Sequence, residues 1–238
     1  MESIDKVHGT FERKIAESEK EKTNVSSAVI KRLPRYHRYL GDLIADGRLR
    51  ISSAELSKIM NVTASQIRQD LNCFGGFGQQ GYGYNIKYLH GKISELLGVN
   101  EGFTAVIVGA GNLGRALAAT HMFERRGVEI VALFDNNEQV VGTTFNGFTV
   151  YNVSELGEFC KKNAISIGVL TVPKESAYAC ATVMAESGVF GIWNFANMEL
   201  SLEDKSVVVQ NVHMGDSLMT LCCGIKTGGD KGILDDQI

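Results

Sequence analysis

The sequence lacks several features that would place it in a special class of protein. No hydrophobic run approaches the roughly 18 residues that a membrane span requires, and the first residues are charged and unlike a signal peptide. Only two of the 238 residues are proline, and the 26 glycines follow no fixed period, which excludes a fibrous chain. The hydrophobic content of 44% is too high for a disordered chain, so we expect a globular protein of one large or two small domains.

Cysteine is sparse as well. The five cysteines are odd in number and none falls in a CxxC pair, which argues against a disulfide framework and a zinc ribbon. We therefore expect a protein of the reducing cytoplasm that holds no metal ion.

Charge is unevenly distributed, although the total of −3 would by itself argue against a nucleic-acid binder. Residues 23–98 hold ten basic and five acidic residues, a net charge of +5, whereas residues 99–238 hold nine basic and sixteen acidic residues, a net charge of −7. Residues 1–22 hold six acidic and five basic residues with almost no apolar pattern, as is typical of a solvated tail. The asymmetry indicates that the positive segment meets a polyanion, or else that surface charge is unbalanced by chance.

The hydrophobic period changes near residue 99. Before it, apolar residues recur at helical spacing; after it, β-rich apolar runs alternate with helical stretches, which indicates βαβ units and a parallel sheet. We expect the boundary at Gly98–Gly102, because Gly98 follows the helical segment Tyr88–Leu97 as a C′ residue.

Two capping boxes predict a pair of short helices. Ser52 and Glu55 start the first helix, and Thr63 and Gln66 start a second helix that runs to about Cys73. Two short helices joined by a turn of about three or four residues form a helix-turn-helix, which seats its second helix in the major groove of DNA.

The second helix has an inward and an outward face. Ile67 and Leu71 lie four apart and face inward. Arg pairs bidentately with guanine and Gln with adenine, so Arg68 and Gln69 are the expected base readers, although Arg68 could instead contact a phosphate. The residues left to face DNA are Ser65, Arg68, Gln69 and Asn72.

A glycine-rich segment, residues 75–84, follows the second helix. Its glycines permit tight turns, and Tyr82 and Tyr84 alternate as strand residues do, so we expect a short β-hairpin, the wing, in preference to a flexible linker. Gln79 and Gln80 lie in this hairpin and are candidate DNA contacts.

Basic residues cluster in the helix that precedes the helix-turn-helix. Beside such a motif they indicate a phosphate-binding surface, in which we single out Arg32 and Arg35. Pro34 is expected in the first turn of that helix or at a kink there. The basic residues are Lys31, Arg32, Arg35 and Arg38, with Arg48 and Arg50 in the following loop.

The second half opens on a dinucleotide-binding pattern. The strand Phe103–Val108 is followed by a GxGxxG turn and by a helical stretch, Arg115–Phe123, which is the context that this motif requires. Its three glycines permit the tight turn, the approach of the pyrophosphate and close helix–strand packing, and the helix N-terminus faces the phosphates. The candidate cofactor-binding residues of the turn are Gly109, Ala110, Gly111, Asn112, Leu113 and Gly114.

An acidic residue completes this pattern. The strand Val128–Phe134 ends at Asp135, where a carboxylate binds the adenosine ribose and repels a 2′-phosphate, so NAD(H) is favoured over NADP(H). The alternatives are an ordinary glycine turn, or a site for FAD or S-adenosylmethionine.

The remaining pattern continues the parallel sheet. Strands are expected at Ile165–Leu170, Val189–Trp193 and Val207–Val212, with helices near Ser154–Lys161 and Lys174–Glu186. Ligands bind at the carboxyl ends of such strands, so the residues that follow them should line the nicotinamide half of the site. These residues are Thr171, Val172, Pro173, Asn194 and Phe195.

The residues that follow the carboxyl ends of these strands include no evident set of catalytic side chains. His213 comes closest, but a lone histidine is more often structural, so we expect a binding protein and not an enzyme. The rival hypothesis is a small NAD-dependent dehydrogenase with a fused helical domain. A second rival is direct thiol sensing through Cys73 or through Cys222 and Cys223.

The order of these elements resembles the Rex family of redox-sensing transcriptional repressors over about residues 25–226. The resemblance implies a homodimer in which the C-terminal helix, residues 216–225, inserts between the partner's two domains, and implies that NADH releases operator DNA while NAD⁺ permits binding. It also implies that Met214 reaches the partner's nicotinamide and that Arg38 forms an interdomain ion pair. The most specific stretches are residues 32–36, 66–71, 81–84, 109–114 and 170–173.

Two positions depart from the pattern of many members of this family. Gln69 stands where the recognition helix often has Lys or Arg, and Gln79 and Gln80 stand where the wing often has a basic residue. These departures affect the operator sequence and leave the fold unchanged.

The sequence thus predicts an α/β protein with a winged helix-turn-helix, a Rossmann-type parallel sheet and a C-terminal helix. The predicted divisions are a tail at 1–24, a DNA-binding domain at 25–98, an NAD(H)-binding domain at 99–212, a dimerisation helix at 213–226 and a polar tail at 227–238.

Overall fold

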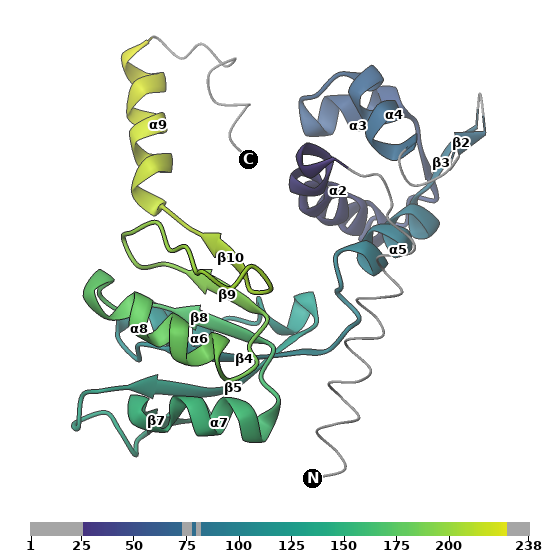
Figure 1. Cartoon of the computed structure of the whole chain (residues 1–238). Helices are drawn as coiled ribbons and strands as arrows, with labels where there is room; N and C mark the ends of the chain where they lie inside the picture. The colour runs from purple at the N-terminus through teal and green to yellow at the C-terminus, as the bar shows by residue number, and fades with distance from the viewer. Residues whose placement is uncertain (1–25, 73–77, 80–81, 228–238) are drawn as a thin grey trace. The chain divides into compact units, whose positions relative to one another are not determined.

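The computed structural model describes residues 26–72, 78–79 and 82–227 (Figure 1). The chain divides into two compact units, one of residues 1–100 and 224–238 and one of residues 101–223, and each unit is described by itself. The N-terminal tail, the C-terminal tail beyond Thr227, Cys73 and Gln80 lie outside the described residues.

The N-terminal unit is a winged helix-turn-helix. Its short sheet is antiparallel, with β3 between β1 and β2, so the predicted wing is confirmed. The elements are α2 (Ser27–Ala45), β1 (Arg50–Ile51), α3 (Ser53–Met60), α4 (Ala64–Asn72), β2 (Gly78–Gln79), β3 (Gly83–Asn85) and α5 (Ile86–Leu96).

Local sequence explains the two helices of the motif. Ser52 and Glu55 cap α3 reciprocally, as predicted. At the start of α4 only half of the second box forms: the Thr63 hydroxyl accepts from the Gln66 N–H at 3.1 Å, while the Gln66 side chain donates to Asp70 at 2.8 Å.

Helix α2 begins earlier than predicted. Ser26 is its N-cap and accepts from the Val29 N–H, so Pro34 lies in the helix interior and the prediction of a first-turn proline is wrong. Proline lacks the N–H that would bond the Ile30 carbonyl. Pro34 and Ile30 are both exposed, so a water molecule can donate a hydrogen bond to the Ile30 carbonyl.

The second unit is built on a seven-stranded sheet in the order β10-β9-β8-β4-β5-β7-β6. All neighbours are parallel except β6 and β7. The strands are β4 (Phe103–Val108), β5 (Val128–Asp135), β6 (Thr144–Phe145), β7 (Phe148–Asn152), β8 (Ile167–Leu170), β9 (Gly191–Asn194) and β10 (Val208–Asn211). The helices are α6 (Asn112–Ala118), α7 (Leu156–Asn163) and α8 (Lys174–Ala185), with 3₁₀ turns η1 (Glu124–Arg126) and η2 (Val153–Glu155). Helix α9 (Met214–Lys226) follows β10, and its residues up to Cys223 are assigned to this unit.

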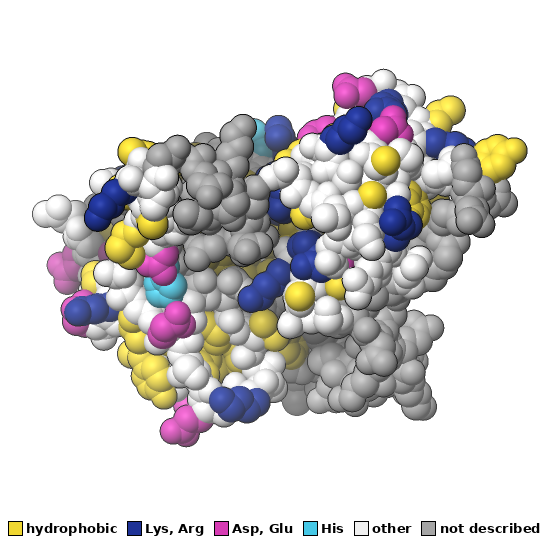
Figure 2. Space-filling view, turned by 90° about the horizontal axis from the view of Figure 1, so that it is seen from above, with side chains coloured by type: hydrophobic (Ala, Val, Ile, Leu, Met, Phe, Trp, Pro, Cys, Tyr) yellow, Lys and Arg dark blue, Asp and Glu magenta, His cyan; other side chains and the backbone are white. Residues whose placement is uncertain are grey.

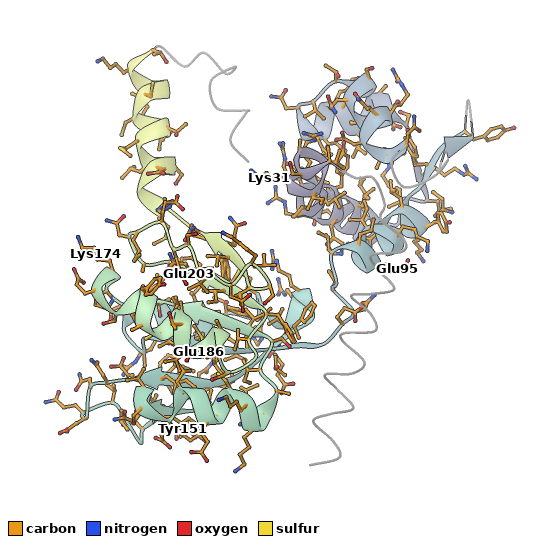
Figure 3. The ribbon with its side chains drawn as sticks, viewed as in Figure 1. Lys31, Glu95, Tyr151, Lys174, Glu186 and Glu203 are labelled. Atoms are coloured by element: carbon orange, nitrogen blue, oxygen red, sulfur yellow. The ribbon has the colours of Figure 1, made fainter. Side chains whose placement is uncertain are left out.

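The sheet is buried on both faces. Along β4, Val106 and Val108 belong to the core cluster that contains residues of α7 and α8, whereas Ile107 belongs to the cluster that contains Ala118 of α6, as the two-residue period of a strand requires. On the first face the ring of Tyr151, labelled in Figure 3, lies 5.7 Å from that of Phe134. Covering both faces leaves the carboxyl ends of the strands as the open edge of this unit.

Two parts of this unit differ from prediction. The hairpin β6–β7 was not predicted; it turns at Asn146 and Gly147, whose φ values are 51° and 87°. The predicted helix Arg115–Phe123 is displaced, because α6 starts directly after Gly111 and ends at Ala118.

Candidate functional site

The glycine turn lies where the strand order reverses. Gly109 follows β4 and Thr171 follows the neighbouring β8, the crevice at which open α/β sheets bind ligands. Gly109 has a φ of +104°, and a Cβ there would lie 2.6 Å from the Thr171 carbonyl oxygen. A Cβ on Gly114 would overlap the Gly109 carbonyl, whereas one on Gly111 would meet nothing within 4 Å. Gly109 and Gly114 are thus required for close backbone packing, because a Cβ at either position would overlap backbone atoms. Gly111 leaves space for a ligand.

Asp135 is tied to this turn. Its Oδ2 accepts from the Ala110 N–H at 2.7 Å, and its Oδ1 accepts from the Asn137 N–H at 2.9 Å. The carboxylate is only partly buried at the end of β5, so each oxygen keeps further acceptor capacity for a hydroxyl group.

A cavity of about 550 Å³ opens beside these groups. It brings together six predicted residues: Gly109, Gly111, Asp135, Thr171, Val172 and Pro173. Sequence reasoning missed its other wall, which α7 and α8 supply. The residues of that wall include Leu156, Glu175, Ser176, Ala179, Cys180 and Val183.

The other predicted cofactor residues are not among those that line the cavity. Asn194 is fully buried, and its Nδ2 donates to the Met198 carbonyl at 3.0 Å and to Asn211 Oδ1 at 2.8 Å. Its amide is therefore engaged inside the unit, and the prediction that Asn194 lines the nicotinamide half stays a prediction. The ring of Phe195 is half-buried against Trp193, with centroids 4.6 Å apart. Met214 is 57% exposed at the start of α9.

The cavity fits an adenine dinucleotide. A carboxylate beside a mainly apolar cavity suits a ribose and an aromatic base, and the open space at Gly111 suits a pyrophosphate. In the part of the chain that the structure describes, no three His, Cys, Asp or Glu side chains gather as metal ligands. No helix among those residues is long and apolar enough to cross a membrane.

The outer face of α4 is exposed to solvent. Ile67 and Leu71 are buried, as predicted, and the Nη1 of Arg68 donates to the Ser53 hydroxyl at 3.1 Å. Figure 2 shows Lys and Arg side chains at several places on this side of the unit. The predicted base-facing residues Ser65, Arg68, Gln69 and Asn72 are all exposed.

Two predicted DNA contacts form hydrogen bonds inside the unit, and their contact with DNA stays a prediction. Arg32 donates to both carboxylate oxygens of Asp70, at 2.8 and 2.7 Å, and Arg35 donates to the Met60 carbonyl at 2.6 Å. Asp70 is fully buried and also accepts from Tyr36 at 2.9 Å. Burial acts to raise the pKa of Asp70, but the hydrogen bonds from Arg32, Gln66 and Tyr36 outweigh it and lower that pKa.

Helix α9 carries an exposed apolar stripe. Four residues at positions i, i+4, i+7 and i+11 share one helix face, and each is about half exposed or more. They are Met214, Leu218, Leu221 and Ile225.

Comparison with known proteins agrees with these two sites. Residues 24–72 match the family "Putative DNA-binding protein N-terminus" and residues 100–198 match the family "CoA binding domain". The chain is 48% identical over 202 residues to the redox-sensing transcriptional repressor Rex of Clostridium botulinum strain Hall, covering 85% of this chain and 96% of the relative.

Solved structures agree as well. A structure of RSP in complex with beta-NAD+ and operator DNA matches with a TM-score of 0.81 and 43% identity, covering 90% of this chain and 99% of that one. A structure of RSP in complex with beta-NADH matches with a TM-score of 0.79 and 42% identity, covering 85% and 95%. The curated relatives are named as transcriptional repressors, not as enzymes. The chain therefore belongs to the Rex family of redox-sensing transcriptional repressors.

Proposed function

We propose that this chain binds operator DNA as a homodimer and that NADH releases it, so that transcription follows the ratio of NADH to NAD⁺. The observation that carries the proposal is the presence, in one chain, of an exposed recognition helix and a cavity suited to a dinucleotide. RSP, which is similar over nearly its full length, has been solved with beta-NAD+ and operator DNA and with beta-NADH.

On the DNA side, the exposed face of α4 supplies the contacts. Arg68 and Gln69 read base edges in the major groove, and the wing residues Gln79 and Gln80 contact the flanking groove. Arg32 and Arg35 act indirectly, since their guanidinium groups already hold Asp70 and the Met60 carbonyl.

On the dinucleotide side, the cavity takes the adenosine half of NAD(H). Asp135 binds the ribose hydroxyls, and the open space at Gly111 admits the pyrophosphate. Thr171, Val172 and Pro173 line the same cavity, and their expected place at the nicotinamide half stays a prediction. The oxidised nicotinamide ring is positively charged and the reduced ring is neutral, so an apolar environment favours NADH. Met214 of α9 supplies an apolar side chain for that environment.

Helix α9 completes the assembly as the dimerisation helix of residues 213–226. Its stripe of four exposed apolar residues would be buried between the domains of a second copy. The functional divisions that we propose are residues 25–98 for DNA and 99–212 for the dinucleotide.

The proposal is tested by titrating NADH, and separately NAD⁺, into a protein–operator complex followed by fluorescence anisotropy. We expect NADH to release DNA at concentrations at which NAD⁺ does not. Because coupling is reciprocal, operator DNA must weaken NADH binding by the same factor. Release at equal concentrations of the two forms would contradict the proposal.

A further inference from the structure

The wing has no cation of its own. The sequence contains no Lys or Arg between Arg68 and Lys87, a stretch that includes the whole β2–β3 hairpin. A hairpin that contacts DNA needs positive charge beside the phosphates. The charge must therefore come from a neighbouring element.

Strand β1 supplies an arginine at this place. Arg50 pairs with Asn85 across the β1–β3 ladder. Its Nη1 donates to the Tyr82 carbonyl at 3.3 Å, and its Cζ lies 6.0 Å from the centroid of the Tyr82 ring. The Tyr82 side chain is 70% exposed, an unusual position for an aromatic ring with no partner beyond this guanidinium among the described residues.

The backbone fixes the direction of Tyr82. Gly83 has a φ of +68°, and a Cβ there would lie 2.6 Å from the Ile51 carbonyl oxygen. Because of this left-handed backbone conformation at Gly83, the side chains of the two flanking tyrosines point in different directions. Tyr84 is buried in the core, whereas Tyr82 points outward. This geometry is built into the ladder and holds the ring beside Arg50.

The neighbouring arginine differs from Arg50 in its partner. Arg48 is 2.7 Å from the Glu55 carboxylate. Hydrogen bonds from the Ser52 backbone, from Arg48 and from the Ser52 hydroxyl lower the pKa of Glu55 to about 2, so the carboxylate stays ionised and offsets the charge of Arg48. Among the residues that the structure describes, no carboxylate pairs with Arg50. Its charge is available to an anion.

We propose that Arg50 and Tyr82 together form a phosphate contact of the wing, in addition to the groove contacts of Gln79 and Gln80. The guanidinium binds a backbone phosphate, and the Tyr82 ring holds it in place and packs against the adjacent sugar. This inference rests on the DNA-binding function proposed above and assigns to β1 a charge that the wing itself lacks. Such a contact positions the protein on DNA without reading sequence.

The test measures operator affinity of the full-length protein over a series of salt concentrations. Arg50→Ala should weaken binding about tenfold for every operator variant and reduce the slope of log K against log salt by about 1. Tyr82→Ala should weaken binding with little change in that slope, because no charge is lost. Arg50→Lys should keep the slope but lose part of the affinity, since a lysine does not stack as a planar guanidinium does.

Lys92→Ala is the matched control. It removes the same charge from α5, where Lys92 lies 2.7 Å from Glu95, the residue labelled at the lower end of this unit in Figure 3. If Arg50→Ala behaves like Lys92→Ala while Arg68→Ala weakens binding, the inference about the wing is overturned and the proposed function stands. If Arg68→Ala also has no effect, the proposed DNA-binding face itself is wrong. Unchanged thermal unfolding shows that each variant is folded.

Discussion

The Asp70 carboxylate shows how one residue can hold a recognition helix in place. It is fully buried, and it accepts hydrogen bonds from Arg32, Tyr36 and Gln66. Since Arg32 and Tyr36 belong to α2, the cluster fastens α4 to that helix. We expect Asp70→Asn to lower the free energy of unfolding by about 2–4 kcal/mol, because the arginine loses its counter-charge in a partly buried site.

Urea unfolding followed by circular dichroism measures this loss. Asp42→Asn is the control, because Asp42 is exposed on the same α2 and its substitution should change stability by less than about 0.5 kcal/mol. Equal stability of the two variants would mean that the cluster contributes nothing.

The same residue predicts a pH dependence. The pKa of Asp70 is lower in the folded protein than its ordinary value, so its contribution is present above about pH 4 and is lost as the pH falls through the folded pKa. The difference in unfolding free energy between the wild type and Asp70→Asn should therefore shrink below about pH 4. A difference that stays constant down to pH values near 2 would show that ionisation of this carboxyl is not the cause.

At the scale of single residues, the sequence predicted the directions of some side chains but not their distant partners. The inward direction of Ile67 and Leu71 follows from helical spacing and is confirmed. The role of Arg32 could not be found in that way, because its partner is 38 residues away and only packing brings the two together. The contacts of Asn194 could not be found for a similar reason: the end of a strand predicts the rim, but the local sequence does not show that its amide donates to Met198 and Asn211.

At the scale of elements, the β4–α6 turn separates structural from ligand-binding glycines. Gly111→Ala should leave thermal stability nearly unchanged, because its φ is −76° and the space is open, but should weaken NADH binding at least about tenfold. Gly114→Ala should instead lower stability by about 1–3 kcal/mol, because the Cβ overlaps the Gly109 carbonyl. Calorimetric titration with NADH and thermal unfolding of both variants check the pair, and a Gly111→Ala variant with normal NADH affinity would contradict the assigned role.

Elements with strong local signals were predicted well. The strand Phe103–Val108 has the predicted bounds, because a short apolar run followed directly by glycine defines where the strand ends. The hairpin β6–β7 was missed although Asn146-Gly147 is a typical turn signal, because the flanking strands are only two and five residues long. The predicted helix Arg115–Phe123 started too late, because its start was placed after the third glycine of the motif. The helix α6 begins at Asn112, before that glycine.

For the whole molecule, the total charge of −3 describes neither half. The +5 segment coincides with the helix-turn-helix and its wing, and the −7 segment contains the dinucleotide cavity. Such a division favours approach of DNA to one unit and discourages it at the other.

In the proposed homodimer, α9 joins the two copies. Leu218 is 61% exposed in the single chain, so Leu218→Asp should leave the fold intact while placing a charge in the proposed interface. We expect the variant to sediment as a monomer, to bind a single operator half-site weakly and to lose tight binding to the full operator, because two linked half-sites bind far more tightly than one. Ser201→Asp adds the same charge to an exposed loop and should remain a dimer. If Leu218→Asp also remains a dimer with normal operator affinity, the stripe on α9 is not the surface that joins the two copies.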